Sequence, residues 1–153
     1  MALYRVRDNL YFSSLPTAQD ENTLRKHHIT HILSTIGPSN VKFQGITYGY
    51  VTLEDNPEQH LIPTAIEAEK WITKAIKENG IVLVNCHAGR SRSVSIVITY
   101  LILQEKLSYA EALRQVKFAR ADAQPNSGFV IELKDLSLIA RRVNEISPCS
   151  IKI

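Results

Sequence analysis

The stretch VLVNCHAGRSRSVSIVI, residues 82–98, joins two apolar segments through a run of small and polar residues. The β-branched run at 81–84 predicts a strand that is covered on both faces, and the apolar run at 91–105 predicts a buried helix. The polar residues between them then lie at the carboxyl end of a central strand, where ligands bind in open α/β sheets. The sequence therefore predicts an α/β fold with its functional site in this loop.

The rest of the chain alternates between strand and helix patterns. Residues 62–79 carry apolar residues at three- and four-residue spacing, with Pro63 near the start and Gly80 just past the end, which is typical of an amphipathic helix. The remaining patterns predict a hairpin at 3–12, strands at 30–35 and 45–53, and helices at 20–28, 108–118 and 127–143. We therefore expect a central mixed, mostly parallel sheet flanked by helices.

Length and composition indicate a single globular domain. The chain has 153 residues, of which 44% are hydrophobic and 22% are charged. We expect the domain to cover residues 1–144 and a C-terminal tail to cover residues 145–153. The net charge of +3 favours anionic ligands, but it is too small for the dense basic stripe of a nucleic-acid binder. Nucleic acid is therefore not an expected partner.

The sequence also bears on location. It contains no run of 18 apolar residues, no signal peptide and no lipidation motif, so no membrane anchor is expected. Its two cysteines, Cys86 and Cys149, are too few for a disulfide framework and suit a reducing compartment. The predicted location is the cytoplasm, with the nucleus as a second compartment.

The loop after the central strand has the chemistry of a phosphate site. A helix N-terminus presents unpaired amide N–H groups and a partial positive charge, Gly89 lets the backbone turn its amides inward, and Arg92 can hold two phosphate oxygens. A phosphate dianion fits this arrangement better than a carboxylate does. The expected phosphate-binding residues are His87, Ala88, Gly89, Arg90, Ser91 and Arg92.

Cys86 stands at the mouth of the same loop. The helix dipole, the loop amides and the arginine all favour the thiolate form there, and a thiolate beneath a bound phosphate is a nucleophile aimed at phosphorus. The alternative is a small buried side chain that merely ends the strand.

These residues resemble a known family. Cys86, five further residues, Arg92 and Ser93 reproduce the signature of the cysteine-dependent protein tyrosine phosphatases, and CHAGRSRS is similar to its dual-specificity branch. The segments NLYFSS, ITHIL and LSYAEALRQVKFARADAQPNSGF also resemble family segments, in family order. The resemblance implies a protein tyrosine phosphatase-like fold and makes residues 1–144 the catalytic domain of a small, atypical dual-specificity phosphatase. It further implies a monomer without metal or cofactor that hydrolyses phosphotyrosine and phosphoserine or phosphothreonine in proteins through a phosphocysteine.

Such a reaction needs a proton donor for the leaving oxygen. In YVTLEDNPEQHL, Asp55 follows a predicted strand and precedes Pro57. Glu54 is a competing candidate from the residues alone, and Asp55 would also suit a simple turn. The resemblance favours Asp55, which matches the acid position of the family.

The resemblance also bears on three further residues. Ser93 matches the hydroxyl that stabilises the departing thiolate, and Asn126 matches an asparagine that braces the phosphate loop. Asn85 is a departure, because the family usually has a histidine directly before the cysteine. An amide can still support the cysteine by hydrogen bonding, but it carries no charge.

Other functions remain open from the sequence. Non-protein phosphates, such as phosphoinositides, phosphoglucans or RNA 5′ ends, are alternative substrates, and a phosphate-recognition module is an alternative to an enzyme. His27, His28 and His31 form an HHxxH pattern, but nearby carboxylates are not evident, so no metal site is expected.

Overall fold

A five-stranded sheet forms the centre of the molecule. The computed structural model describes the backbone of residues 1–151 and the side chains of residues 1–142. The strand order is β1-β2-β5-β3-β4, in which β1 pairs antiparallel with β2 and the other pairs are parallel. The predicted mixed, mostly parallel sheet and the central place of β5 are thus confirmed. The strands are β1 (Tyr4–Arg7), β2 (Leu10–Ser13), β3 (His31–Ser34), β4 (Thr47–Tyr50) and β5 (Val82–Asn85).

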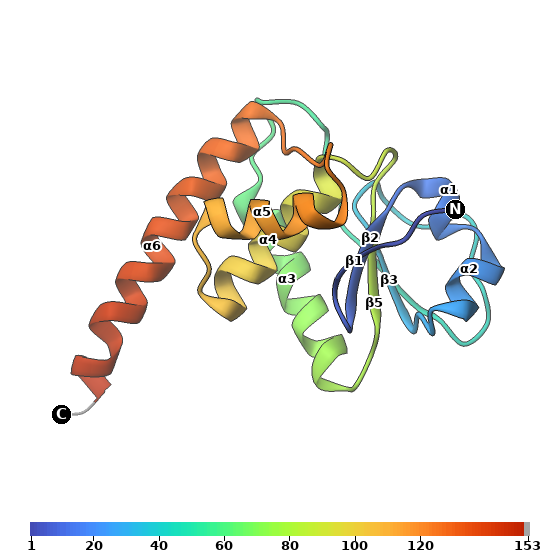
Figure 1. Cartoon of the computed structure of the whole chain (residues 1–153), viewed down its shortest axis with the longest axis horizontal. Coiled ribbons are helices and arrows are strands. Elements are labelled where there is room, and N and C mark those ends of the chain that lie inside the picture. Colours follow the sequence, from blue (N-terminus) through green and yellow to red (C-terminus); the bar gives the residue numbers. More distant parts are fainter. Residues whose placement is uncertain (152–153) are drawn as a thin grey trace.

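Helices cover both faces of the sheet (Figure 1). The short helices α1 and α2 lie on one face, and α3 to α6 lie on the other. Each face has its own hydrophobic core, and the larger core is the one beneath α3 and α4. The helices are α1 (Leu15–Ala18), α2 (Glu21–Lys26), α3 (Ile62–Lys77), α4 (Arg92–Glu105), α5 (Tyr109–Ala119) and α6 (Ser127–Ile151).

Helix α4 is the buried helix that its sequence predicts. Val94, Ile96 and Leu101 are fully buried in it, together with the residues between them up to Thr99. An all-round apolar helix is stable only when it is enclosed, and α3, α5, α6 and the sheet enclose this one. Its N-terminus, which carries the predicted site, is therefore held rigidly.

Two helices differ from the sequence prediction. Helix α6 does not end at residue 143 but continues to Ile151. No glycine or proline interrupts the chain between Gly128 and Pro148, so the local sequence lacks a stop signal at residue 143. Helix α1 was not predicted, because four residues are too few to show a helical period. The boundary between domain and tail at residue 144 stays a prediction.

Local capping explains where α2 and α5 begin. The side chain of Asp20 accepts a hydrogen bond from the amide of Thr23, and Ser108 accepts one from the amide of Glu111. Ser108 and Glu111 have the spacing of a capping box, but the Glu111 carboxylate pairs with Arg114 instead of returning to residue 108, so only half of such a box is formed. None of the helices in the part of the chain that the structure describes is both long and apolar enough to cross a membrane.

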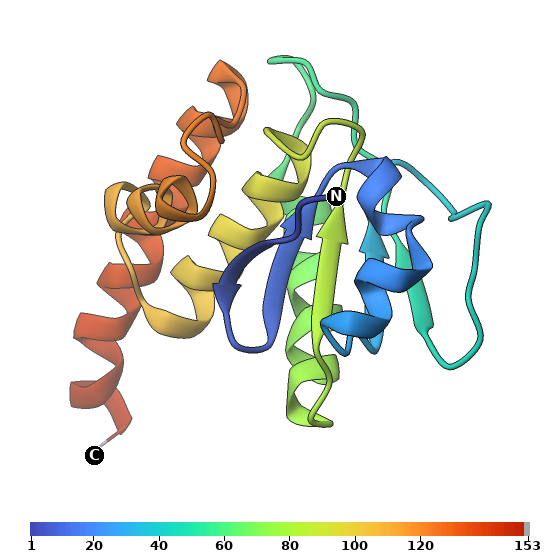
Figure 2. The ribbon, with the colours of Figure 1, turned by 45° about the vertical axis from the view of Figure 1, so that its right-hand side comes forward.

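The parallel strands end at one edge of the sheet, and the predicted site lies there. Figure 2 shows β5 between its neighbours, with the chain turning from its end into α4. Ser13 of β2 and Ser34 of β3 lie directly beside Asn85 in register. The loop of residues 86–91 thus begins from a strand that is fixed on both sides.

Candidate active site

The loop of residues 86–91 closes around the sulfur of Cys86. Cys86 is only 2% exposed, and its Sγ accepts a hydrogen bond from the Gly89 amide at 3.1 Å. The Ser93 hydroxyl lies 3.2 Å from the same sulfur. Gly89 has φ +71°, and a Cβ there would lie 2.7 Å from the Ser13 carbonyl carbon. Only glycine allows this loop to pass so close to β2 and still point its amide at the sulfur.

Arg92 lies in the first turn of α4 and lines the same pocket. One Nη donates to the carbonyl of Leu53 at 3.2 Å, and Nε is buried with no hydrogen-bond partner among the described residues. A buried guanidinium N–H without a protein partner suits an anionic ligand. The pocket has a volume of ≈ 300 Å³ and is lined by Asp55, Cys86, Ala88, Arg90, Ser91, Arg92, Asp122 and Gln124.

Asp55 is tied directly to the loop. Its Oδ1 accepts hydrogen bonds from the Ser91 hydroxyl at 2.7 Å and from the Asn126 side-chain amide at 3.0 Å. Both hydrogen bonds use the same carboxylate oxygen, Oδ1. Glu54 is exposed and accepts from the Asn56 amide instead. The structure therefore brings Asp55 to the loop and leaves Glu54 outside it.

The start of α6 holds the segment that carries Asp55. The backbone amide of Asn126 donates to Ser91 Oγ at 3.0 Å, so this residue contacts both the loop and Asp55. A Cβ on Gly128 would lie 2.0 Å from the Pro57 carbonyl oxygen, so the segment packs directly on the helix backbone. Farther along, Glu132 accepts hydrogen bonds from the amides of Leu61 and Ile62 at the start of α3. Asp55 is thus fixed from a part of the chain far away in sequence.

Asn85 ties the loop to the sheet through its main chain. Its carbonyl oxygen accepts from both the amide and the hydroxyl of Thr35, at 2.9 and 3.0 Å. The side chain is 1% exposed, and neither atom of its amide has a hydrogen-bond partner within the described residues. Support of Cys86 by the Asn85 side chain stays a prediction.

The histidine pattern lies elsewhere. His27 contacts the Thr23 carbonyl, and His31 contacts the Thr30 hydroxyl and the edge of Trp71. In the described residues, no group of three or more His, Cys, Asp or Glu side chains could hold a metal ion. Cys149 falls outside the described side chains.

The chain is similar to known proteins over most of its length. Residues 10–137 match the family model "Dual specificity phosphatase, catalytic domain", which is more than half of the sequence. The chain belongs to the dual specificity phosphatase family. The curated relatives are named dual specificity protein phosphatases, which are phosphoric monoester hydrolases, so the predicted family, activity and class of phosphoprotein substrate are confirmed.

The sequences of known relatives align with most of the length of this dual specificity phosphatase. It is 35% identical to dual specificity protein phosphatase 1 of Arabidopsis thaliana, over 86% of this chain and 67% of that protein. It is 37% identical to dual specificity protein phosphatase 19 of Mus musculus, over 82% of this chain and 57% of that protein. The crystal structure of DUSP15 superimposes with a TM-score of 0.84 at 30% identity, over 94% of this chain and 95% of that one. The predicted fold is confirmed by this likeness.

Some residues around the phosphatase loop were not predicted from the sequence. Arg120 donates to the carbonyls of Ala88 and Gly89, and the Gln124 amide donates to the carbonyl of Arg90. Both residues lie in the connection between α5 and α6. An arginine in ARADAQ looks like an ordinary surface charge, so only its place in a family segment could have drawn attention to it.

Proposed function

We propose that this dual specificity phosphatase hydrolyses phosphomonoesters through a phosphocysteine on Cys86. One observation carries the assignment. The Cys86 sulfur lies at the centre of a loop whose Gly89 amide and Ser93 hydroxyl point at it, and the loop itself is bonded to Asp55. Nucleophile, anion cradle and proton donor therefore line one pocket.

In the first step, the thiolate of Cys86 attacks phosphorus in line with the leaving oxygen. Arg92 and the amides of residues 87–92 hold the equatorial oxygens, where negative charge is spread in the transition state. As the P–O bond breaks, Asp55 gives its proton to the departing oxygen and becomes a carboxylate. The alcohol or phenol leaves, and phosphorus stays bonded to sulfur.

In the second step, water attacks the phosphocysteine. Asp55, now ionised, takes a proton from the water as the new P–O bond forms, and the P–S bond breaks to return the thiolate. The Ser93 hydroxyl, 3.2 Å from the sulfur, donates a hydrogen bond to the charge that develops there. The products are inorganic phosphate and the starting form of the enzyme.

The supported substrates are phosphotyrosine and phosphoserine or phosphothreonine in proteins. The pocket is open enough that Ala88 and Arg90 of its lining are exposed, which suits both the long aryl and the short alkyl phosphoesters. We expect a monomer in the cytoplasm or nucleus that has no membrane anchor and does not bind nucleic acid. The modest net charge of +3 is consistent with this expectation.

Trapping the intermediate tests the proposal. When the enzyme is mixed with a phosphotyrosine peptide and quenched in acid within milliseconds, the peptide that contains Cys86 should gain one phosphoryl group by mass spectrometry. Chelators should leave the yield unchanged. A phosphoryl group on another residue would contradict the mechanism. So would hydrolysis of a dinitrophenyl phosphate by Asp55→Asn without any trapped species, because this ester needs no acid in the first step whereas the second step lacks its base. Faster turnover of inositol phosphates or RNA 5′ phosphates than of phosphopeptides would instead contradict the substrate class.

A second prediction concerns Asn85. Replacing it by histidine places a group that can become cationic directly before Cys86, and a neighbouring positive charge favours the thiolate. In Asn85→His, the midpoint of Cys86 alkylation by iodoacetamide should therefore move to lower pH than in the wild-type enzyme. Asn85→Ala serves as the control that removes the amide without adding charge. An unchanged midpoint in Asn85→His would show that residue 85 does not influence the sulfur electrostatically.

A further inference from the structure

The carbonyl groups of residues 87–90 in the phosphate loop all accept hydrogen bonds from other segments of the chain. The Leu15 amide donates to the His87 carbonyl at 3.0 Å, and the Gln124 amide donates to the Arg90 carbonyl at 2.7 Å. Between these, one Nη of Arg120 donates to the carbonyls of Ala88 and Gly89, at 2.7 and 3.1 Å. Each carbonyl from residue 87 to residue 90 is thus held by a donor on the outer side of the loop.

The direction of a carbonyl decides the direction of the next amide. In a trans peptide group, the C=O of one residue and the N–H of the next point in opposite directions. Holding the carbonyls of Ala88 and Gly89 outward therefore turns the N–H groups of Gly89 and Arg90 inward. The first of these two amides does reach the Cys86 sulfur, at 3.1 Å.

Arg120 is itself fixed from several sides. Its Nε donates to Asp122 at 2.7 Å, and its guanidinium carbon lies 4.8 Å from the centre of the Tyr4 ring. Tyr4 in turn stacks on the fully buried Phe12, with ring centres 5.2 Å apart. The Arg120 side chain is only 19% exposed, so water competes weakly for its hydrogen bonds. A planar guanidinium suits this position because it can serve the two carbonyls and the carboxylate at once.

Asp122 keeps this arrangement formed at neutral pH. The hydrogen bond from Arg120 holds the pKa of the Asp122 carboxyl below its usual value. The carboxylate therefore stays ionised, and its pairing with Arg120 is lost only when the pH falls through that lowered pKa.

We propose that Arg120 is a positioning residue of the phosphate site, which aims the amides of Gly89 and Arg90 at the bound oxyanion by holding the preceding carbonyls. Arg120 acts from outside the pocket, so it does not need to touch substrate. A guanidinium on a carbonyl also polarises the whole peptide group, and this strengthens the N–H donor on its far side. The inference rests on the proposed function, because the oxyanion it concerns is the phosphoryl group.

Tungstate binding tests the role of Arg120 without turnover. Tungstate is a tetrahedral oxyanion, and its affinity for the full chain can be measured by calorimetry. Because charge-assisted hydrogen bonds are strong, Arg120→Ala should weaken tungstate binding about tenfold or more. Arg120→Lys keeps the charge but loses the planar fork, so its affinity should fall between those of Arg120→Ala and the wild-type enzyme.

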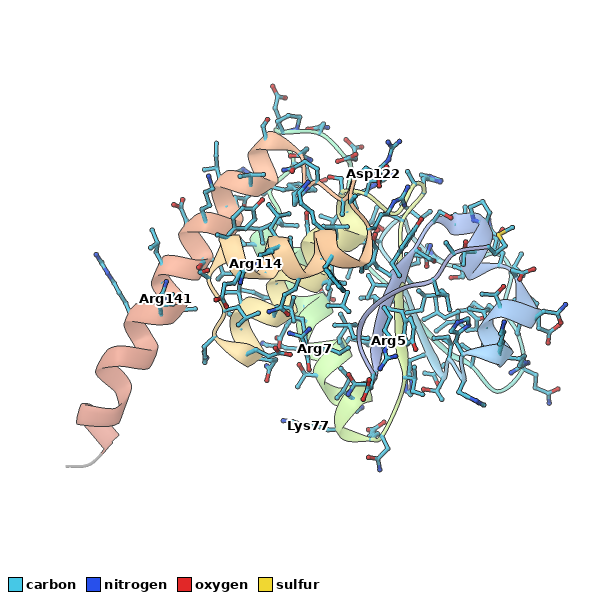
Figure 3. The ribbon with its side chains drawn as sticks, viewed as in Figure 1. Arg5, Arg7, Lys77, Arg114, Asp122 and Arg141 are labelled. Carbon is cyan, nitrogen blue, oxygen red and sulfur yellow. The ribbon has the colours of Figure 1, made fainter. Side chains whose placement is uncertain are left out.

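High salt separates positioning from simple loss of charge. In 1 M NaCl the screening length is only about 3 Å, so a long-range charge effect should disappear, whereas misdirected amides should still weaken binding. The matched control is Arg114→Ala, which removes a charge from α5, the helix just before Arg120. Arg114 is 72% exposed, pairs only with Glu111 among the ion pairs of the described residues, and lies away from the loop and from Asp122 (Figure 3). Its variant should bind tungstate as the wild-type enzyme does at both salt concentrations.

The outcomes distinguish this inference from the proposed function. If Arg120→Ala binds tungstate normally in 1 M NaCl, or if Arg120→Lys matches the wild-type enzyme, Arg120 does not position the loop. If the wild-type chain itself fails to bind tungstate, the assignment of the loop as a phosphate site is wrong. A thermal unfolding curve tests whether each variant is folded. If Arg120→Ala does not fold, the comparison of Arg120→Lys with the wild-type enzyme decides.

Discussion

Replacing Cys86 by serine should reduce hydrolysis of p-nitrophenyl phosphate by at least about a thousandfold, because an un-ionised hydroxyl is a far weaker nucleophile than a thiolate. The loop favours an anion at this position through the Gly89 amide and the Ser93 hydroxyl. Neither group is a base, so neither can take the proton from a serine hydroxyl. Steady-state release of p-nitrophenolate measures the effect.

The same variant should still bind tungstate. The loop amides and Arg92, which provide the anion site, are untouched by the change from sulfur to oxygen. Calorimetry on Cys86→Ser therefore serves as the control that the site is intact. Turnover above about a hundredth of the wild-type rate in a variant that binds tungstate normally would exclude Cys86 as the nucleophile.

Replacing Asp55 by asparagine should slow hydrolysis according to the leaving group. A phenolate or alkoxide that departs unprotonated is slow to leave, so phenyl phosphate and phosphotyrosine peptides should lose about a hundredfold or more in kcat. An ester of dinitrophenol needs no proton, and the first step of its hydrolysis should change little. The two substrates are compared in single-turnover kinetics.

Glu54→Gln is the matched control for this experiment. The two carboxylates are adjacent in sequence, but Asp55 bonds to Ser91 and Asn126 whereas Glu54 accepts from Asn56. Glu54→Gln should therefore leave both substrates unaffected. A selective loss for the poor leaving group in Glu54→Gln, and not in Asp55→Asn, would transfer the acid role to Glu54.

Much of this fold could be predicted because its elements are local patterns. The strand at Val82–Asn85, the loop and the helix at Arg92–Glu105 follow from a contiguous run of residues, and so does the central place of that strand. The end of α6 could not be predicted in the same way, since the sequence there lacks a stop signal. Helix α1 has only four residues, too few to show a helical period in the sequence.

Without the family resemblance, which also pointed to Asp55 and Asn126, the site was predictable only where its residues share one segment. Cys86, Gly89 and Arg92 are close in sequence, so their chemistry can be recognised together. The choice between Asp55 and Glu54 depends on which carboxylate reaches Ser91 and Asn126, and this is decided by packing between distant segments. The same is true of Arg120 on the loop carbonyls and of Gly128 against Pro57. Sequence patterns carry no information on such contacts.

The outward carbonyls of the phosphate loop have a consequence for how the enzyme folds. Their donors, Leu15, Arg120 and Gln124, come from segments before and after the loop in the chain. Contacts between remote segments require long stretches of chain to be closed first, so they form late. A chain in which only β5 and α4 have formed would contain Cys86 but not the oriented loop amides that bind the phosphate. Catalytic competence should therefore be among the last properties acquired during folding and among the first lost when the ends of the domain loosen.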